Sequence, residues 1–296
     1  MSDASDGSVP SHVAVPSDGT FSIGKDAWLA RMGNLRNVVR QELIARQLAA
    51  HLPPPPARVL DVGAGQGTQA IRLAARGYRV TAVEPDAQMR ELFTAAAGRQ
   101  PDDVQARIDL RAGHIGELAA AVGAAGTGAA YDLVQCHGVL MYLPSSAAAI
   151  AELASFVAPG GLLAIAARSA AFLPWRALLR GDWQGAQDAF DELDLAAAQA
   201  RDARYVNEIG SPARADTIDG LITLCQAAGL HCESWYGVRV ASDDEDLAAP
   251  VPADEAELAR ILQIEERLGR TDPYRQLGAL FHLIARRPRL GDAIAV

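Results

Sequence analysis

Short apolar segments alternate with helical patterns from residue 58 to residue 168, and this alternation restricts the possible folds more than any other feature of the chain. Five buried strands are predicted, at Arg58–Val62, Arg79–Glu84, Ile108–Ala112, Asp132–Cys136 and Leu162–Ala167. The segments between them have helical apolar spacing, at Thr68–Ala75, Ala87–Ala97, Gly116–Ala121 and Ser146–Val157. Strands that alternate with helices pair in parallel, because each helix returns the chain to the same end of the sheet. The pattern therefore predicts an α/β fold with a doubly wound, mostly parallel sheet that binds ligands at the carboxyl ends of its strands.

The segments on either side of this region complete the predicted domain organisation. Residues 1–21 are rich in Ser, Asp, Gly and Pro and form a predicted disordered tail, and residues 22–57 form a helical cap that ends at four consecutive prolines. The α/β domain is predicted over residues 58–290, with a helical insertion at residues 170–216. After the insertion, the predicted elements are helix Ile218–Ala228, strand Cys232–Val240, helix Glu255–Leu268 and strand Leu280–Ala285. The two added strands bring the sheet to seven, and we expect the last one to be antiparallel.

Charge and cysteine content narrow the range of functions. The chain carries 27 Lys and Arg residues against 36 Asp and Glu residues, a net charge of −9, so it lacks the broad positive surface of non-specific nucleic-acid-binding proteins. Its three cysteines match no zinc or redox spacing, and no metal site is predicted. The N-terminus lacks the pattern of a signal peptide, and no apolar segment is long enough to cross a bilayer. We therefore expect a reduced, cytoplasmic protein without a membrane partner.

A glycine-rich turn, Asp61-Val62-Gly63-Ala64-Gly65-Gln66-Gly67, follows the first predicted strand. A strand, a glycine-rich turn and a helix together present backbone N–H groups to a ligand, which suits a nucleotide-type cofactor. The spacing G-x-G-x-G differs from the G-x-G-x-x-G of dinucleotide sites, and the carboxylate of Asp61 suits the cationic amino group of S-adenosylmethionine better than a pyrophosphate. Glu84, at the end of the second strand, is placed to accept hydrogen bonds from ribose hydroxyls. These features favour S-adenosylmethionine over a dinucleotide, or over a tight turn that binds nothing.

Further motifs accompany this turn over about residues 25–287. They are Gly33-Asn34-Leu35-Arg36, Asp86-Ala87-Gln88-Met89, His137-Gly138-Val139-Leu140, Pro159-Gly160-Gly161, Tyr236-Gly237-Val238-Arg239-Val240, Asp272-Pro273-Tyr274, Leu277-Gly278 and His282. Together they resemble the class I S-adenosylmethionine-dependent methyltransferases and, more specifically, the bacterial tRNA carboxymethoxyuridine methyltransferases, which methylate the carboxylate of a modified wobble uridine. The resemblance implies a Rossmann-like methyltransferase fold, S-adenosylmethionine as the cofactor and tRNA as the partner.

The resemblance also implies roles for individual residues. The implied cofactor contacts are Arg36, Asp61, Gly63, Ala64, Gly65, Glu84, Pro85, Gly113, His114 and His137. In this set the arginine is placed near the methionine carboxylate, and the pair Gly113-His114 lies beside the adenine. Arg239 and Tyr274 are the candidates for positioning the substrate. His137 becomes the candidate catalytic base if the methyl acceptor is a hydroxyl or an amine, and a core histidine without a catalytic role is the alternative.

The chain departs from the tRNA enzymes in the insertion. Their lysine-rich run is replaced here by Tyr205-Val206-Asn207-Glu208-Ile209-Gly210, and the loop Ser242–Asp246 is acidic. The cationic and aromatic residues that remain are Arg168, Arg176, Arg180, Arg201, Arg204, Arg214, Trp175, Trp183 and Tyr205. These arginines either grip an anticodon loop or pair with acids of the insertion as a solvated lid. The alternatives to a tRNA substrate are a small-molecule acid or alcohol as the methyl acceptor, or cofactor binding without catalysis.

Overall fold

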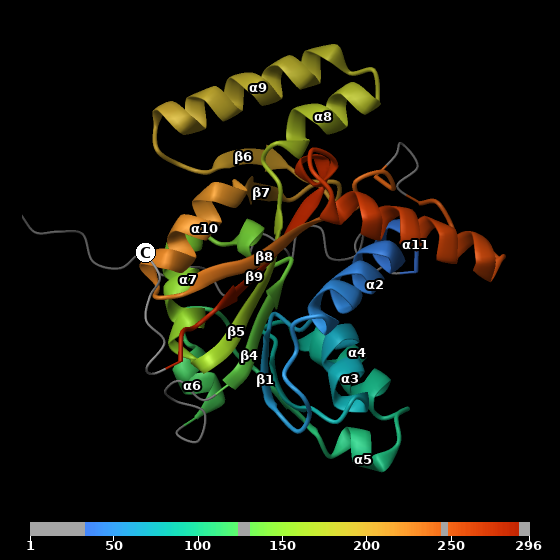
Figure 1. Ribbon diagram of the computed structural model, residues 1–296, viewed down its shortest axis with the longest axis vertical. Helices are drawn as coiled ribbons and strands as arrows, with labels where there is room; N and C mark the ends of the chain where they lie inside the picture. Colours follow the sequence, from blue (N-terminus) through green and yellow to red (C-terminus); the bar gives the residue numbers. More distant parts are fainter. Residues whose placement is uncertain (1–32, 124–130, 244–247, 290–296) are drawn as a thin grey trace, which may run out of the picture.

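A seven-stranded sheet with the strand order β3-β2-β1-β4-β5-β9-β8 runs through the centre of the molecule (Figure 1). The structure is a computed structural model that describes residues 33–123, 131–243 and 248–289, so the predicted tail and the first part of the cap lie outside it. The strands are β1 (Arg58–Val62), β2 (Arg79–Val83), β3 (Ile108–Arg111), β4 (Tyr131–His137), β5 (Val157–Arg168), β8 (His231–Val238) and β9 (Leu280–Arg286). The first five pair in parallel, whereas β9 is antiparallel to both β5 and β8. The predicted α/β fold with an antiparallel last strand is confirmed.

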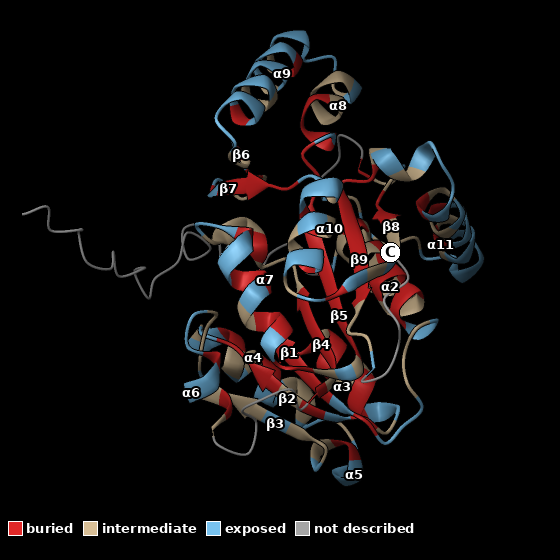
Figure 2. Cartoon of the chain, turned by 60° about the vertical axis from the view of Figure 1, so that its left-hand side comes forward, coloured by how far each residue is buried: buried red, intermediate tan, exposed pale blue. Residues whose placement is uncertain are grey.

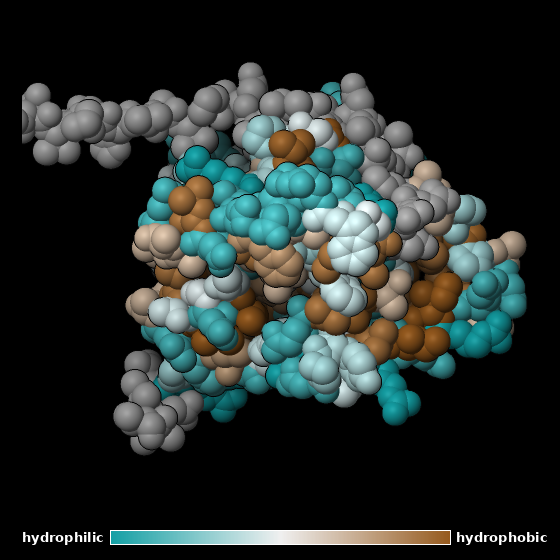
Figure 3. Space-filling model, turned by 90° about the horizontal axis from the view of Figure 1, so that it is seen from above, coloured by the Kyte–Doolittle hydropathy of each residue, from teal (hydrophilic) through white to brown (hydrophobic). Residues whose placement is uncertain are grey.

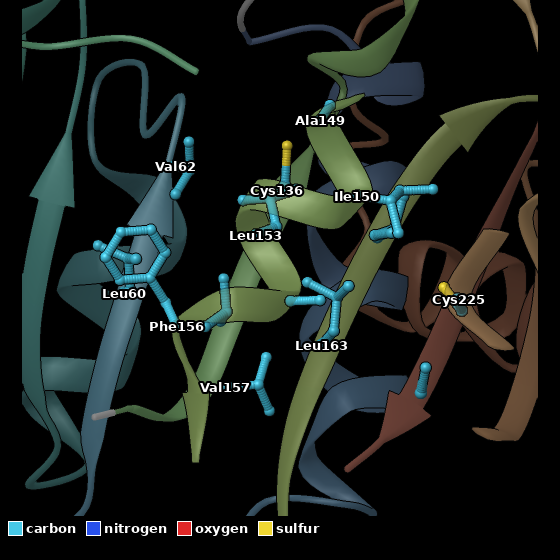
Figure 4. Close-up of a cluster of buried hydrophobic side chains, with 14 of the residues drawn as sticks. Leu60, Val62, Cys136, Ala149, Ile150, Leu153, Phe156, Val157, Leu163 and Cys225 are labelled. Carbon is cyan, nitrogen blue, oxygen red and sulfur yellow. The ribbon is translucent and has the colours of Figure 1, made fainter. Parts of the chain in front are cut away.

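Helices cover both faces of the sheet, whose strands are largely buried (Figure 2). The helices around the sheet are α2 (Leu35–Ala49), α3 (Thr68–Ala75), α4 (Ala87–Ala97), α5 (Asp102–Gln105), α6 (Leu118–Val122), α7 (Ser146–Ser155), α10 (Ile218–Ala227) and α11 (Glu255–Arg270), with the short 3-10 helices η2 (Leu140–Tyr142) and η3 (Tyr274–Leu277). Successive side chains of a strand point to opposite faces, so Leu60 belongs to the core beneath α6, α7 and α10 (Figure 4), and Val59 to the core beneath α2, α3 and α4. Within the described ranges, every helix is too short or too polar to cross a bilayer.

Strand β5 is longer than predicted because it contains the Pro159-Gly160-Gly161 motif. It begins at Val157, which pairs with Tyr131, and the register then shifts before Leu162. A Cβ atom on Gly161 would lie about 3 Å from three backbone oxygens, so only glycine fits the close approach of the chain there. The motif therefore forms an irregularity inside the strand, and α7 ends two residues earlier than predicted.

The insertion stands above the carboxyl ends of the strands (Figure 1). It consists of α8 (Phe172–Leu179) and α9 (Trp183–Ala198), followed by the antiparallel strands β6 (Ala203–Val206) and β7 (Pro212–Ala215). The helical expectation for this region is therefore incomplete, because strands of four residues are too short to give a readable alternation of polar and apolar positions. The turn between β6 and β7 points back toward the sheet and contributes residues to the site.

Candidate functional site

A cavity of about 730 Å³ lies at the carboxyl ends of β1, β2, β4 and β5. Helix α2 lines one side of it, and Tyr205 and residues 207–209 of the insertion line another. A second cavity, of about 850 Å³, lies at the opposite ends of β1, β2 and β3, beside Arg58 and Arg79. Parallel α/β sheets bind their ligands at the carboxyl ends of the strands, so the first cavity is the candidate site.

The glycine-rich turn forms one wall of this cavity with its backbone. The N–H groups of Gly63 and Ala64 both donate to the carbonyl of Val83, at 2.8 and 3.2 Å, and so hold the turn against β2. Gly63 has a φ of +72°, and a Cβ atom there would lie 2.3 Å from Cγ2 of Val139. A side chain at this position would therefore strain the turn and collide with the opposite wall.

Two buried carboxylates lie beside the turn. Both oxygens of Glu84 accept backbone N–H groups, Oε2 from Gly65 at 2.8 Å and Oε1 from Asp86 at 2.9 Å, which fixes the orientation of the carboxylate. Burial raises the pKa of Glu84 above its usual value. Burial, aided by the neighbouring Glu84 carboxylate, also raises the pKa of Asp61 to about 7. This end of the cavity, which we call the cofactor end, is thus suited to a cationic group and to hydroxyl donors.

The structure brings most of the predicted site residues together in one place. The cavity is lined by Arg36, Asp61, Gly63, Ala64, Gly65, Glu84, Pro85, His114, His137 and Arg239. Gly113 is not part of the lining and instead packs closely against Ala121, where a Cβ atom would lie 2.5 Å from the alanine Cβ. Tyr274 lies in η3, is half exposed and is also outside the lining. The structure therefore does not bring these two residues to the cavity.

The two histidines of the lining differ in their surroundings. His114 is partly exposed, and its Nδ1 lies 2.8 Å from the carbonyl oxygen of Ile115. His137 ends β4 and meets His282 edge to face, with 5.2 Å between the ring centroids. Burial, with a smaller contribution from the charge of Arg40, lowers the pKa of His137 to about 3. The imidazole is therefore neutral at pH 7 and is a weak base.

The other end of the cavity holds a group of charges that the sequence did not reveal as a group. We call it the arginine cluster, and it consists of Arg36, Arg168, Arg176, Arg239, Glu208 and Asp243. Oε1 of Glu208 lies 2.7 Å from Arg168 and 3.2 Å from Arg176. Oδ1 of Asp243 accepts from Arg36 at 2.7 Å and lies 3.2 Å from Arg239. The sequence places Asp243 in an acidic loop, and the structure shows this carboxylate buried among guanidinium groups.

Four arginines against two carboxylates leave the arginine cluster with a surplus of positive charge. Burial acts to raise the pKa of Glu208, but the surrounding arginines outweigh it and hold this pKa well below its usual value. The pKa of Asp243 is lowered in the same way. Burial lowers the pKa of Arg239 to about 10, which still leaves this side chain charged at pH 7. The cluster therefore carries two more positive than negative charges and is suited to an anion.

Two of the remaining arginines of the insertion, Arg201 and Arg214, pair with acids of the insertion, as one of the two expectations had it. Arg201 contacts Glu192 at 2.6 Å, and Arg214 pairs with Asp202 and, at 3.4 Å, with Asp216. Seen from above, hydrophilic and hydrophobic side chains alternate on the surface (Figure 3). Trp183, at 73% exposure, is the most exposed large apolar residue in the described part of the insertion. Arg201 and Arg214 are therefore engaged within the insertion, whereas most arginines of the cluster line the cavity.

The sheet order, the glycine-rich turn and the cavity define a Rossmann-like methyltransferase fold. The family model described as "Methyltransferase domain" matches residues 35–234. The chain belongs to this family. The prediction of a methyltransferase with S-adenosylmethionine as its cofactor is confirmed.

Relatives place the chain within this broad family. It is 27% identical over 264 residues to the tRNA 5-carboxymethoxyuridine methyltransferase of Escherichia coli O157:H7, which covers 88% of this chain and 92% of that protein. It is 34% identical over 131 residues to the ubiquinone biosynthesis O-methyltransferase of Xanthomonas axonopodis pv. citri (strain 306), covering 43% of this chain and 48% of that protein. The crystal structure of Burkholderia thailandensis 1,6-didemethyltoxoflavin-N1-methyltransferase, with bound S-adenosylhomocysteine, has a TM-score of 0.53, is 18% identical, and covers 95% of this chain and 93% of its own. This structure supports the fold.

Proposed function

We propose that this protein methylates the carboxylate of a carboxymethoxyuridine at the wobble position of tRNA. The tRNA enzyme of E. coli aligns with nearly the whole chain, including the insertion, whereas the ubiquinone enzyme aligns with less than half of it. The observation that carries the proposal is the positive surplus of the arginine cluster at the end of the cavity away from Glu84. A carboxylate acceptor is the anion that this arrangement fits.

At the cofactor end, the protein's own groups bind and orient the methyl donor. Asp61 offers a carboxylate to the amino group, Glu84 accepts from the ribose hydroxyls, and His114 lies where the adenine is expected. Arg36 reaches the cavity from α2 and, in this proposal, contacts the methionine carboxylate. The bound cofactor supplies an electrophilic methyl group, and the protein must align the acceptor with it and exclude water.

The acceptor end suits a nucleophile that needs no deprotonation. Burial lowers the pKa of His137 to about 3 and raises the pKa of Tyr142, so neither group is a good proton acceptor near neutral pH. A carboxylate is already ionised at pH 7 and can attack directly. His137 and Tyr142 therefore suit a carboxylate acceptor better than a hydroxyl or an amine.

The test is methyl transfer to tRNA from a strain that lacks the wobble-uridine methyl ester. We expect the purified protein, with S-adenosylmethionine, to produce S-adenosylhomocysteine and to convert the carboxymethoxyuridine into its methyl ester, detected by mass spectrometry of the nucleosides. A Glu84→Ala variant should be inactive, and a Glu91→Ala variant, altered at an exposed acid of α4, should retain activity. If the methyl ester does not form, tRNA is not the substrate. If no S-adenosylhomocysteine forms with any acceptor, the protein only binds the cofactor.

A small-molecule carboxylic acid is the second candidate acceptor. The chain carries a net charge of −9, and the arginines Arg201 and Arg214 are engaged by acids, which leaves less positive surface for a polyanion such as tRNA. The arginine cluster fits either acceptor, because both present a carboxylate. Formation of S-adenosylhomocysteine with small di- or tricarboxylic acids, but not with tRNA, would favour this candidate.

A further inference from the structure

We propose that Glu208 stands in for the carboxylate of the methyl acceptor, occupying its place among the arginines until the acceptor displaces it. This inference rests on the proposed function, in that the cluster receives an anionic acceptor. It adds a specificity-determining residue in the β6–β7 turn, on a segment of the insertion that lies apart from the cofactor end of the cavity.

The contacts of Glu208 are those of a bound carboxylate ligand. A single oxygen, Oε1, lies 2.7 Å from Arg168, 3.2 Å from Arg176 and 3.5 Å from Arg36. These three arginines come from β5, α8 and α2, so the oxygen marks the point where separate elements converge. Arginine groups arranged in this way form a recognition site for an anion.

The arginines have hydrogen-bonding capacity that Glu208 does not use. The Nε atoms of Arg168, Arg176 and Arg239 are buried and have no hydrogen-bond partner among the residues that the structure describes. Buried donors without a partner are costly, and they indicate that a further acceptor is missing. A guanidinium binds a carboxylate most strongly through two parallel N–H groups, a geometry that the single-oxygen contacts of Glu208 do not provide.

The β6–β7 turn can carry Glu208 away as a unit. Within the turn, Oδ1 of Asn207 accepts from the N–H groups of Ile209 at 3.1 Å and Ser211 at 2.9 Å, so the turn holds its own shape. Its strands form a separate two-stranded sheet, which meets the end of β5 through an isolated bridge between Ser169 and Asp216. Withdrawal of the turn breaks the ion pairs of Glu208 and a 3.3 Å hydrogen bond from Asn207 to Tyr142, while Arg214 of β7 holds the base of the hairpin through hydrogen bonds to the carbonyls of Leu140 and Leu143.

The displacement has a consequence for charge. With Glu208 in place, the cluster has two surplus positive charges. Withdrawal of Glu208 raises this surplus to three, and the acceptor then brings a negative charge of its own. A ligand whose accepting group is itself a carboxylate compensates the cluster, whereas a neutral ligand leaves it uncompensated. Glu208 thereby favours acidic acceptors and excludes neutral ones.

The experiment compares Glu208→Gln with a matched control, Glu192→Gln, which alters another acid of the insertion that pairs with Arg201 outside the cavity lining. The probes are succinate and the free nucleoside 5-carboxymethoxyuridine, with binding measured by calorimetry in the presence of S-adenosylhomocysteine. Removing the competing charge should tighten carboxylate binding by about tenfold in Glu208→Gln, with no change in Glu192→Gln. Affinity for the cofactor should be the same in both variants.

Weaker or unchanged carboxylate binding in Glu208→Gln would overturn the inference, because a permanent counterion that orients the arginines would give that result. A Glu208→Asp variant serves as the second measurement: it keeps the charge but withdraws it from the arginines, and it should bind the probes with intermediate affinity. If Glu208→Gln does not fold, Glu208→Asp decides the question. The inference is then overturned if Glu208→Asp binds the carboxylate probes no more tightly than the wild type does. If the wild type fails to methylate tRNA while Glu208→Gln still binds succinate more tightly, the tRNA proposal fails and the inference about Glu208 stands.

Discussion

The two ends of the cavity are built in opposite ways. The cofactor end uses backbone groups and acids from two short segments, residues 61–67 and 84–86, at the carboxyl ends of β1 and β2. The arginine cluster uses side chains from α2, β5, α8, the β6–β7 turn and the segment after β8. One end therefore presents carboxylates to the cavity, and the other presents a surplus of positive charge. The comparison teaches that a local motif builds the cofactor end, whereas the tertiary fold builds the arginine cluster.

The largest expected effect tests the cofactor end. Glu84→Ala should raise the Kd of S-adenosylmethionine by about a hundredfold or more, because it removes a charged acceptor for two hydroxyls and leaves the N–H groups of Gly65 and Asp86 without a partner. Isothermal titration calorimetry measures the change, with Glu91→Ala as the control. An unchanged Kd would show that Glu84 supports the turn and does not bind the ribose.

The pH dependence of cofactor binding tests the charge of the same end. Asp61 has a pKa of about 7 and binds an ammonium group only when ionised, so it is competent above pH 7 and loses that charge as the pH falls below it. Affinity for S-adenosylmethionine should therefore fall by up to about tenfold for each pH unit below 7. Titration calorimetry between pH 5 and pH 8 gives the profile, and Asp61→Asn should flatten it. A wild-type profile that is already flat would contradict the assignment.

Arg36 belongs to the arginine cluster but is also the predicted contact of the methionine carboxylate, so it tests the distinction between the two ends. It lines the cavity, yet its guanidinium pairs with Asp243 of the arginine cluster. If it also holds the methionine carboxylate, Arg36→Gln should raise the Kd of S-adenosylmethionine by about tenfold. Arg46→Gln, a change on the same helix at the partly buried ion pair with Glu266, is the control. A change in the acceptor KM without any change in the cofactor Kd would assign Arg36 to the acceptor end alone.

The smallest expected effect concerns His137. Since a carboxylate acceptor needs no base, His137→Gln should lower kcat by less than about tenfold, compared with the 10²–10⁴ that general-base catalysis typically contributes. Burial lowers the pKa of His137 to about 3, so the wild-type kcat should show no acidic limb near pH 6.5. Steady-state kinetics of the wild type and the variant across this pH range measure both. A hundredfold loss of kcat in the variant, together with an acidic limb near pH 6.5 in the wild type, would identify His137 as the base and favour a hydroxyl or amine acceptor.

Most of the fold was predictable because the strands are short, apolar and separated by helices of ordinary length. The errors fall where pairing with a distant segment decides the structure. The extension of β5 through Pro159-Gly160-Gly161 depends on its pairing with Tyr131, and the β6–β7 hairpin depends on a four-residue register. Neither leaves a periodic signal within its own segment.

The sequence by itself determined the cofactor end, since Asp61, the glycine-rich turn and Glu84 follow consecutive strands and need only parallel pairing to meet. Only the tertiary structure decided the arginine cluster. Arg36 and Asp243 are separated by 207 positions in the chain, and each arginine taken alone matches the pattern of an exposed helix or loop charge. Their convergence depends on where β5, β8 and the insertion place them, and the energy of a charge depends on its surroundings more than on its neighbours in sequence. For that reason Arg168 and Arg176, two of the arginines that suggested a solvated lid, are instead paired with Glu208 in the arginine cluster.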